Sequence, residues 1–272
     1  MSSIVFTARD PSLDVTLVIP VLNEAGSILT LSDEIEAAMS PGAWSWECMW
    51  VDDGSTDSTA LELARLHERD SRHGYVRFDR RQGQSIALAE GMRRARGAMI
   101  ATMDGDGQND PADLPRFLAL AGEARADMVN GVRVRRRNTP LRRLSSRIAN
   151  SFRNWMTRER VRDVGCSLRV VRREAIEGVV VFRGMHRFLP TLVRMNGYDR
   201  LYELPANDRA RLRGKTKYGV WNRLWVGIGD TIMVRWLWMR SARPGDSAVR
   251  TPGEPADPRR EDKERSSIRS AT

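Results

Sequence analysis

The sequence predicts an α/β fold built on one mostly parallel central sheet. Short apolar runs alternate with segments whose apolar residues recur every three or four positions, the pattern of strands alternating with amphipathic helices. Acidic residues follow two of the apolar runs, as at the carboxyl ends of strands in open α/β sheets that bind ligands. A chain of 272 residues is long enough to bury the core of such a domain.

The predicted elements follow one another along the chain. Strands are expected at residues 15–19, 46–51, 75–78 and 99–103, with helices at 27–39, around 61–66 and at 85–95. In the second half we expect an amphipathic helix at 140–156, a return to the sheet at 163–171 and 178–182, and a short strand at 198–204. Residues 1–13 are a polar leader, and dense proline, glycine and mixed charge predict a disordered tail at 242–272.

Residues 219–241 predict amphipathic helices that lie in a membrane interface. They contain four of the chain's eight tryptophans, and indole side chains favour the headgroup region of a bilayer. Arg223, Asp230 and Arg235 interrupt the apolar run, so we expect no membrane-spanning helix. The alternative is a helical hairpin packed against the sheet.

The basic charge of the chain is concentrated in one segment. Residues 1–130 carry 12 basic and 21 acidic side chains, whereas residues 131–240 carry 26 basic and 8 acidic ones. A concentrated positive field favours an anionic partner, such as a phosphate, a nucleic acid or an acidic membrane surface. Cys48 and Cys166 lie far apart in a chain without a cleavable apolar leader, so we expect free thiols and a cytoplasmic location.

Paired acids follow the fourth predicted strand. Asp104 and Asp106 are separated by Gly105, and alternate residues at a strand end can direct two oxygen ligands at one cation. A magnesium-type ion suits such ligands, because it takes its remaining ligands from water and substrate phosphates. Asp-Gly pairs also form ordinary turns, but Asp52 and Asp53 end a second strand and favour a ligand site at this edge.

Other motifs leave their alternatives open. The turn at residues 82–84 precedes a helix, where backbone N–H groups could bind phosphate or simply form a turn. Neither a Gly-x-Gly-x-x-Gly run nor a Gly-Lys-Ser/Thr loop is present, which disfavours dinucleotide-binding and P-loop proteins. The arginines from 133 to 147 form either a solvated basic face or a site for an anionic acceptor. His67, His73 and His186 lack metal-ligand spacing, and we expect no role for them.

Five short motifs together resemble one enzyme family. They are Pro20-Val-Leu-Asn-Glu24, Val51-Asp-Asp-Gly-Ser-Thr-Asp57, Asp104-Gly-Asp-Gly-Gln108, Gly131-Val-Arg133 and Arg211-Leu-Arg-Gly-Lys-Thr-Lys-Tyr-Gly219. In this order and spacing, residues 14–240 resemble the inverting family 2 glycosyltransferases, and within them the polyprenyl-phosphate branch that includes dolichol-phosphate mannosyltransferase. The chain departs from that branch in having Thr216 where a serine is usual, and in lacking clear transmembrane helices.

The resemblance implies a single Rossmann-like, GT-A type catalytic domain at residues 14–218. Its donor-binding half is residues 14–130 and its basic acceptor half is residues 131–218. It implies donor-binding roles for Pro20, Leu22, Glu24, Val51, Asp53, Asp104, Gly105 and Asp106. It implies a catalytic group of Asp104, Asp106 and Gln108, with Mg²⁺ or Mn²⁺ held by Asp104 and more directly by Asp106. It implies phosphate and acceptor contacts from Arg133, Arg147, Arg211 and Lys217.

The activity that this resemblance implies is transfer of one sugar, with inversion, from a UDP- or GDP-sugar to polyprenyl phosphate. The protein would be peripheral on the cytoplasmic face of the plasma membrane, and a homo-oligomer is possible. Negative charge builds on the leaving nucleoside diphosphate, and a divalent cation stabilises it. A lipid monophosphate, with a second pKa near ~6, is already largely ionised at neutral pH, so it needs no strong general base.

Two alternatives make different predictions. The same fold could glycosylate a hydroxyl acceptor on a glycan or lipid headgroup, in which case Asp163 is the candidate base that deprotonates the hydroxyl. A basic nucleic-acid-binding module would instead show steeply salt-dependent affinity for nucleic acid. Paired acids within an α/β sheet disfavour this module, so we expect no nucleic-acid partner.

Overall fold

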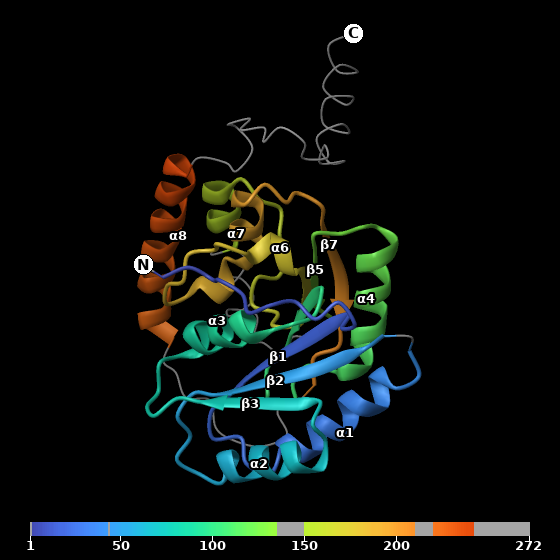
Figure 1. Ribbon diagram of the computed structural model, residues 1–272. Coiled ribbons are helices and arrows are strands. Elements are labelled where there is room, and N and C mark those ends of the chain that lie inside the picture. Colours follow the sequence, from blue (N-terminus) through green and yellow to red (C-terminus); the bar gives the residue numbers. More distant parts are fainter. Residues whose placement is uncertain (1, 43, 135–149, 210–219, 242–272) are drawn as a thin grey trace. The chain divides into compact units, whose positions relative to one another are not determined.

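The computed structural model describes residues 2–42, 44–134, 150–209 and 220–241, and these form a layered α/β structure (Figure 1). Seven strands make one sheet in the order β3-β2-β1-β4-β6-β5-β7. Neighbouring strands are parallel except at β6, which runs antiparallel to both β4 and β5. The predicted α/β class and mostly parallel sheet are therefore confirmed.

The predicted alternation of strands and helices is observed through the first half of the chain and extends into the second. The strands are β1 (Val15–Val21), β2 (Trp46–Asp52), β3 (His73–Arg77), β4 (Met99–Thr102), β5 (Met128–Arg133), β6 (Arg169–Arg172) and β7 (Leu201–Ala206). The helices are α1 (Ile28–Met39), α2 (Thr59–Arg69), α3 (Gln84–Arg94), α4 (Leu114–Glu123), α6 (Arg173–Ile176), α7 (Leu189–Met195) and α8 (Val220–Arg240), with 3₁₀ turns η1 (Pro111–Asp113) and η2 (Met185–Arg187). Residues 150–157 are also helical.

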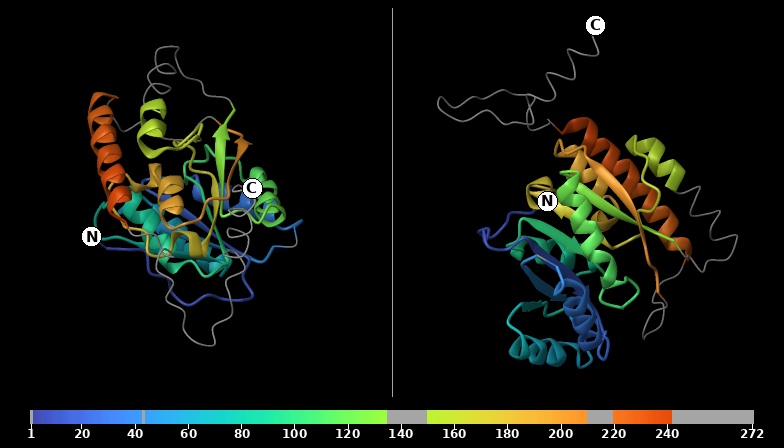
Figure 2. Two further views of the ribbon diagram at one scale, coloured as in Figure 1. Left: turned by 90° about the horizontal axis from the view of Figure 1, so that it is seen from above. Right: turned by 90° about the vertical axis from the view of Figure 1, so that its right-hand side faces the viewer.

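The helices cover both faces of the sheet, because the side chains of each strand alternate between the faces. On β1, Leu17 and Ile19 pack with the apolar side chains of α1, α2 and α4. Val18, between them, packs with α3, α6 and α7 on the opposite face. Figure 2 shows these two helical layers on either side of the strands.

Gly91 brings α3 close to the sheet. A Cβ atom at this position would lie 2.3 Å from Cγ1 of Val18 and 3.0 Å from Cγ2 of Val51. Only glycine permits this approach without repacking. The consequence for the site is that the first turn of α3, with Gln84 and Ser85, lies beside the carboxyl ends of β1 and β4.

Two predicted segments differ in the structure. Residues 178–182, expected in the sheet, form no sheet strand; Val180 makes only an isolated bridge with Ser3. Both hydrogen-bonding positions beside β6 are already taken, by β4 and β5, so this apolar run packs on the core instead. The expected polar leader likewise packs along the domain, and Ile4 is fully buried.

Residues 220–240 form one helix, α8, which packs on the domain along one side. Val234 of α8 is fully buried and Thr231 nearly so, whereas Ile232, Trp236 and Met239 are exposed. None of the described helices is both long enough and apolar enough to cross a bilayer. The predicted tail at 242–272, and most of the helix predicted at 140–156, lie outside the described residues.

His73 gives the fold a testable pH dependence. Its side chain is 2% exposed, and its Nδ1 accepts a hydrogen bond from the Trp50 indole N–H at 3.1 Å. Burial lowers the pKa of His73 to about 4 from an ordinary value of 6.5. The unfolded chain therefore takes up a proton at higher pH than the native protein, so stability falls as the pH drops from 6.5 towards 4. Between about pH 7 and about pH 4.5 we expect this histidine to remove roughly 2–3 kcal/mol of unfolding free energy.

Urea unfolding at both pH values measures this loss. His73→Asn is the matched variant, since its amide can still accept from Trp50 but does not titrate in this range. We expect His73→Asn to be less stable at neutral pH and to lose less stability on acidification. Equal losses in both proteins would contradict the assignment.

Candidate functional site

The paired acids lie in a tight turn at the carboxyl end of β4. A Cβ atom on Gly105 would lie 2.4 Å from Cγ1 of Val21, so the turn approaches β1 too closely for any larger residue. Asp106 is 6% exposed and accepts a hydrogen bond from the backbone N–H of Gln108 at 3.1 Å. The backbone N–H of Asp104 donates to Oδ1 of Asn109 at 2.9 Å. The geometry therefore holds both carboxylates in one small loop, as predicted.

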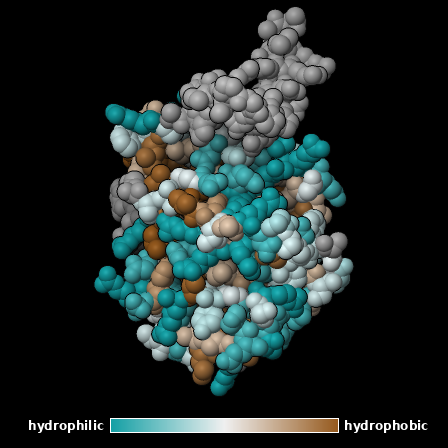
Figure 3. Space-filling view, in the orientation of Figure 1, coloured by the Kyte–Doolittle hydropathy of each residue, from teal (hydrophilic) through white to brown (hydrophobic). Residues whose placement is uncertain are grey.

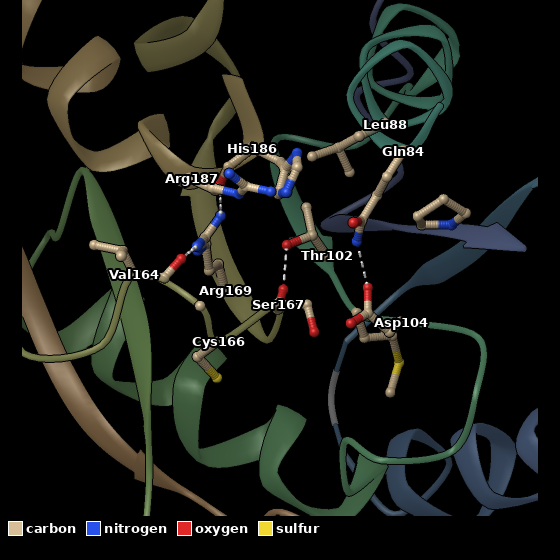
Figure 4. A pocket seen from close by; sticks show the side chains of 13 residues that line it. Gln84, Leu88, Thr102, Asp104, Val164, Cys166, Ser167, Arg169, His186 and Arg187 are labelled. Atoms are coloured by element: carbon tan, nitrogen blue, oxygen red, sulfur yellow. Dashed lines mark hydrogen bonds between the residues drawn. The ribbon is translucent and has the colours of Figure 1, made fainter. Parts of the chain in front are cut away.

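The surroundings of Asp104 raise the pKa of its carboxyl group. Burial, and then the negative charge of Asp106, raise the pKa of Asp104 to about 6. Its Oδ1 accepts a hydrogen bond from the side-chain amide of Gln84 on α3, at 2.8 Å (Figure 4). A divalent cation between the two carboxylates would relieve their repulsion, and below about pH 6 a proton on Asp104 would compete with it.

The donor set fits a magnesium-type ion. Within the described ranges, no group of three or more histidine, cysteine or acidic residues is placed to hold a metal. Two carboxylates alone suit Mg²⁺ or Mn²⁺, which take their other ligands from water and from phosphate oxygens of a substrate. The site would therefore be completed by a phosphate-bearing ligand.

The predicted donor pocket lies where the loops after β1 and β2 interlock. The backbone N–H of Asn23 donates to Oγ of Ser55 at 2.9 Å, and that of Glu24 donates to Oγ1 of Thr59 at 3.0 Å. Leu22 and Glu24 are half-buried in this loop, and Pro20 lines the pocket beside Asp104.

Asp53 and Val51 hold the structure around the predicted donor pocket. The Asp53 carboxylate accepts hydrogen bonds from the backbone N–H groups of Gln82 at 2.7 Å and Gly83 at 2.9 Å, and so fixes the turn that precedes α3. The side chain of Val51 is fully buried beneath α3. Val51 was predicted to contact the donor, but its side chain lies in the core.

Arg133, predicted to contact a phosphate, forms a two-point ion pair with Asp163. The Arg133 Nε lies 2.8 Å from Oδ2 of Asp163, and Nη2 lies 3.0 Å from Oδ1. The backbone N–H of Gly165 also donates to Oδ1 of Asp163, at 3.0 Å. Asp163 is thus a structural partner of Arg133, and it is poorly placed to act as the base that a hydroxyl acceptor requires.

The predicted residues Arg147, Arg211 and Lys217 lie outside the described residues. Arg209, the last described residue before this gap, contacts the loop that follows the acid pair. The backbone N–H of Arg209 donates to the carbonyl oxygen of Gln108 at 2.8 Å, and its guanidinium pairs with Glu34 at 2.9 Å and with Asp110.

A pocket of about 240 Å³ opens beside Asp104. Its lining includes residues that the sequence did not indicate, namely Ser167, Arg169, His186 and Arg187. Figure 4 shows Arg169, His186 and Arg187 on the opposite side of this pocket from Asp104. An arginine inside the apolar run 168–171 was the available signal for Arg169, because a charged residue in a buried strand needs a specific reason.

The chain is similar in sequence to known proteins. Residues 16–180 match the sequence profile of Glycosyl transferase family 2. The chain is 36% identical over 242 residues to dodecaprenyl-phosphate galacturonate synthase of Rhizobium johnstonii, covering 87% of this chain and 71% of that protein. It is 35% identical over 206 residues to undecaprenyl-phosphate 4-deoxy-4-formamido-L-arabinose transferase of Pseudomonas aeruginosa, covering 75% of this chain and 60% of that protein.

The fold is also found among solved structures. Glucosyl-3-phosphoglycerate synthase of Mycobacterium tuberculosis, crystallised with Mn²⁺, UDP and phosphoglyceric acid, superposes with a TM-score of 0.61 and 19% identity. The alignment covers 86% of this chain and 81% of that one. At this identity the likeness concerns the fold, and it agrees with the predicted GT-A type architecture.

Gly105 provides the test of the acid loop. Gly105→Ala should displace the loop, because its Cβ would overlap Val21; we expect a loss of about 1–3 kcal/mol in unfolding free energy and weaker metal-dependent nucleotide binding. Gly122→Ala is the matched control, since a Cβ there meets nothing within 4 Å and alanine favours the helix by up to about 1 kcal/mol. Urea unfolding and nucleotide titration with Mn²⁺ measure both effects. Similar behaviour of the two variants would contradict the packing argument.

Proposed function

The chain belongs to glycosyl transferase family 2, and from this premise we propose that it transfers one sugar, with inversion, from a UDP- or GDP-sugar to polyprenyl phosphate. The observation that carries the proposal is the acid pair at the end of β4, with Asp106 buried and Asp104 half-buried beside a pocket of about 240 Å³. The protein is a glycosyltransferase by family. The two relatives are named for different sugars, a uronate and a formamido-arabinose, so their names do not fix the sugar.

Residues of this chain have distinct tasks in the proposed reaction. Asp106 and Asp104 would hold Mg²⁺ or Mn²⁺, which supplies positive charge to the leaving nucleoside diphosphate. Gln84 orients Asp104 through its hydrogen bond. The interlocked loops that carry Leu22 and Glu24 form the wall for base and ribose.

The structure favours a phosphate acceptor over a hydroxyl acceptor. A phosphate monoester, with a second pKa near ~6, attacks as an anion without losing a proton to the protein. The base named for a hydroxyl acceptor, Asp163, is engaged by Arg133 through two hydrogen bonds. Freeing this carboxylate would break a buried ion pair, at a cost of about 3–5 kcal/mol.

A metal-dependent ligand screen tests the proposed donor. UDP- and GDP-sugars should raise the melting temperature only when Mg²⁺ or Mn²⁺ is present. At a ligand concentration 100-fold above Kd, the expected gain in unfolding free energy is about 2.7 kcal/mol. Asp106→Asn should abolish this response, whereas Glu68→Gln, an exposed acid on α2, should retain it. If no sugar nucleotide stabilises the wild-type protein in the presence of metal, the proposed donor class is wrong.

The acceptor is tested by comparing a short polyprenyl phosphate with the corresponding polyprenol. We expect transfer to the phosphate alone, and a product with inverted anomeric configuration. Transfer to the polyprenol or to a glycan hydroxyl would instead support the hydroxyl alternative.

We also propose that α8 and the helical residues 150–157 lie against the inner face of the plasma membrane. Trp155 is 74% exposed and Trp236 is 51% exposed. Trp155 and Arg235 line one surface depression, and the Arg240 guanidinium lies 5.3 Å from the Trp236 ring. Figure 3 shows apolar surface gathered over α8. Exposed indoles beside arginines suit an interface with anionic lipid.

Vesicle sedimentation tests the membrane surface. We expect Trp236→Ala to weaken binding to phosphatidylglycerol vesicles about tenfold. A tenfold change in affinity corresponds to about 1.4 kcal/mol, which is less than the free energy gained by fully burying a large apolar side chain. Leu61→Ala is the control, because Leu61 is 52% exposed on α2, at a distance in sequence and fold from α8. Equal effects of the two substitutions would contradict this orientation.

A further inference from the structure

The order of the strands fixes the direction in which a donor would lie. The predicted base and ribose residues follow β1 and β2, the acid pair follows β4, and the pocket's far wall comes from residues just before β6 and from η2. Along this edge of the sheet, the diphosphate would lie at Asp104 and Asp106. The sugar would therefore extend into the pocket, towards Arg169 and Arg187.

The far wall contains a buried cation. Arg169 is 3% exposed, and its guanidinium donates to Oδ1 of Asn130 at 2.9 Å and to the carbonyl oxygens of Val164 at 2.8 Å and His186 at 2.6 Å. All three acceptors are neutral, and Arg169 forms no ion pair with any carboxylate in the described part of the chain. The charges of Asp104 and Asp163 act on Arg169 without contacting it. A bound anion would add a contacting counter-charge and offset the cost of burying the guanidinium.

His186 and Arg187 extend the wall around the pocket. The Nδ1 of His186 lies 2.7 Å from Oγ of Ser85, which also accepts the backbone N–H of Gly184 at 2.9 Å. This hydrogen bonding fixes the position of η2 against α3. Behind the loop lies Asp230 of α8: burial raises its pKa, and the charge of Arg187 offsets part of that rise.

We propose that this wall, formed by Arg169, His186 and Arg187, binds a carboxylate on the donor sugar, so that the donor is a nucleotide-linked uronic acid. The inference rests on the proposed function and names its substrate class. A guanidinium presents parallel N–H groups that match a carboxylate, and it gains much less from a neutral hydroxymethyl group. The pocket volume of about 240 Å³ is below the roughly 300–1,000 Å³ of sites for drug-sized ligands, which suits a single sugar ring.

The acceptor's phosphate is the other oxyanion that could occupy the wall. It differs from the sugar carboxylate in a way that can be measured. If the wall binds the sugar carboxylate, substitutions in it weaken the binding of only those donors that carry a carboxylate. If the wall binds the acceptor's phosphate, the same substitutions weaken acceptor binding whichever donor is used.

The experiment uses matched donor pairs that differ only in carboxylate against hydroxymethyl. These are UDP-galacturonate with UDP-galactose, UDP-glucuronate with UDP-glucose, and GDP-mannuronate with GDP-mannose. Affinity is measured by calorimetry with Mn²⁺ in the full-length wild-type protein, Arg187→Gln, Arg187→Lys and Arg183→Gln. Arg183 is the matched control, since it is exposed on the same loop and does not line the pocket.

For the pair that the enzyme uses, we expect the wild type to bind the uronate at least about tenfold more tightly than its neutral partner. Arg187→Gln should lose this preference, so that the uronate and its neutral partner bind with similar affinity. Arg187→Lys should keep part of it, and Arg183→Gln all of it.

Three outcomes would overturn the inference, and they are distinguishable. Binding of neutral sugars without preference for a uronate would refute the carboxylate subsite and leave the proposed function intact. Unchanged donor affinities in Arg187→Gln, together with a raised KM for polyprenyl phosphate, would assign the wall to the acceptor. Failure of every sugar nucleotide to bind with metal would refute the proposed function, and the subsite with it.

Discussion

The site depends on one topological constraint, the insertion of antiparallel β6 between β4 and β5. Because β6 runs against both neighbours, its first residue, Arg169, pairs with Thr102, the last residue of β4, and with Asn130 of β5 in the sheet register. The residues before β6 are thereby brought against the acid loop. Oγ of Ser167 donates to Oδ1 of Asn109 at 2.7 Å, and the same oxygen accepts the backbone N–H of Asp104. The acid loop and the far wall of the pocket are consequently held together by one set of hydrogen bonds.

The same arrangement explains where the basic charge is used. Several described arginines of residues 131–240 pair with acidic side chains: half-buried Arg133 with Asp163, and exposed Arg200 with Asp127. Arg169 is buried at the pocket. Much of the basic charge of this segment lies outside the described residues. Family membership favours an enzyme over a nucleic-acid-binding module.

Elements with a periodic apolar pattern can be predicted from the sequence. The place of a short apolar run depends on which strand edges are already occupied by other strands, and the sequence does not show this. Helices α1, α2 and α3 were predicted because their apolar residues repeat every three or four positions. Helix α4 was not predicted, although its buried Leu114, Phe117, Leu118 and Ala121 have the same spacing. Residues 178–182 were misassigned because a short apolar run has no period that separates a strand from a packed loop. Only the sheet order shows that no hydrogen-bonding position remained for them beside β6.

Part of the site could be predicted from the sequence and part could not. Asp104, Asp106 and Gly105 could be recognised from local spacing, because the ligands and the turn are neighbours in the chain. The far wall could not, since Ser85 and His186 are separated by 101 residues and meet only through the packing of α3 on the sheet. The Arg133–Asp163 pair shows the same limit, because these residues are 30 positions apart in the sequence and only their contact in the structure shows that Asp163 is engaged.

Helix α8 lies between the proposed membrane surface and the loop that lines the pocket. Its exposed side carries Trp236 and Met239, while Asp230 lies against the pocket loop at Gly184. Gly184 has φ +96°, and a Cβ there would lie 2.5 Å from Oδ2 of Asp230. The loop can therefore pass between α3 and α8 only with glycine at this position. A helix that rests on lipid on one side and on the pocket loop on the other would bring the phosphate of a lipid acceptor and the donor sugar to the same side of the domain.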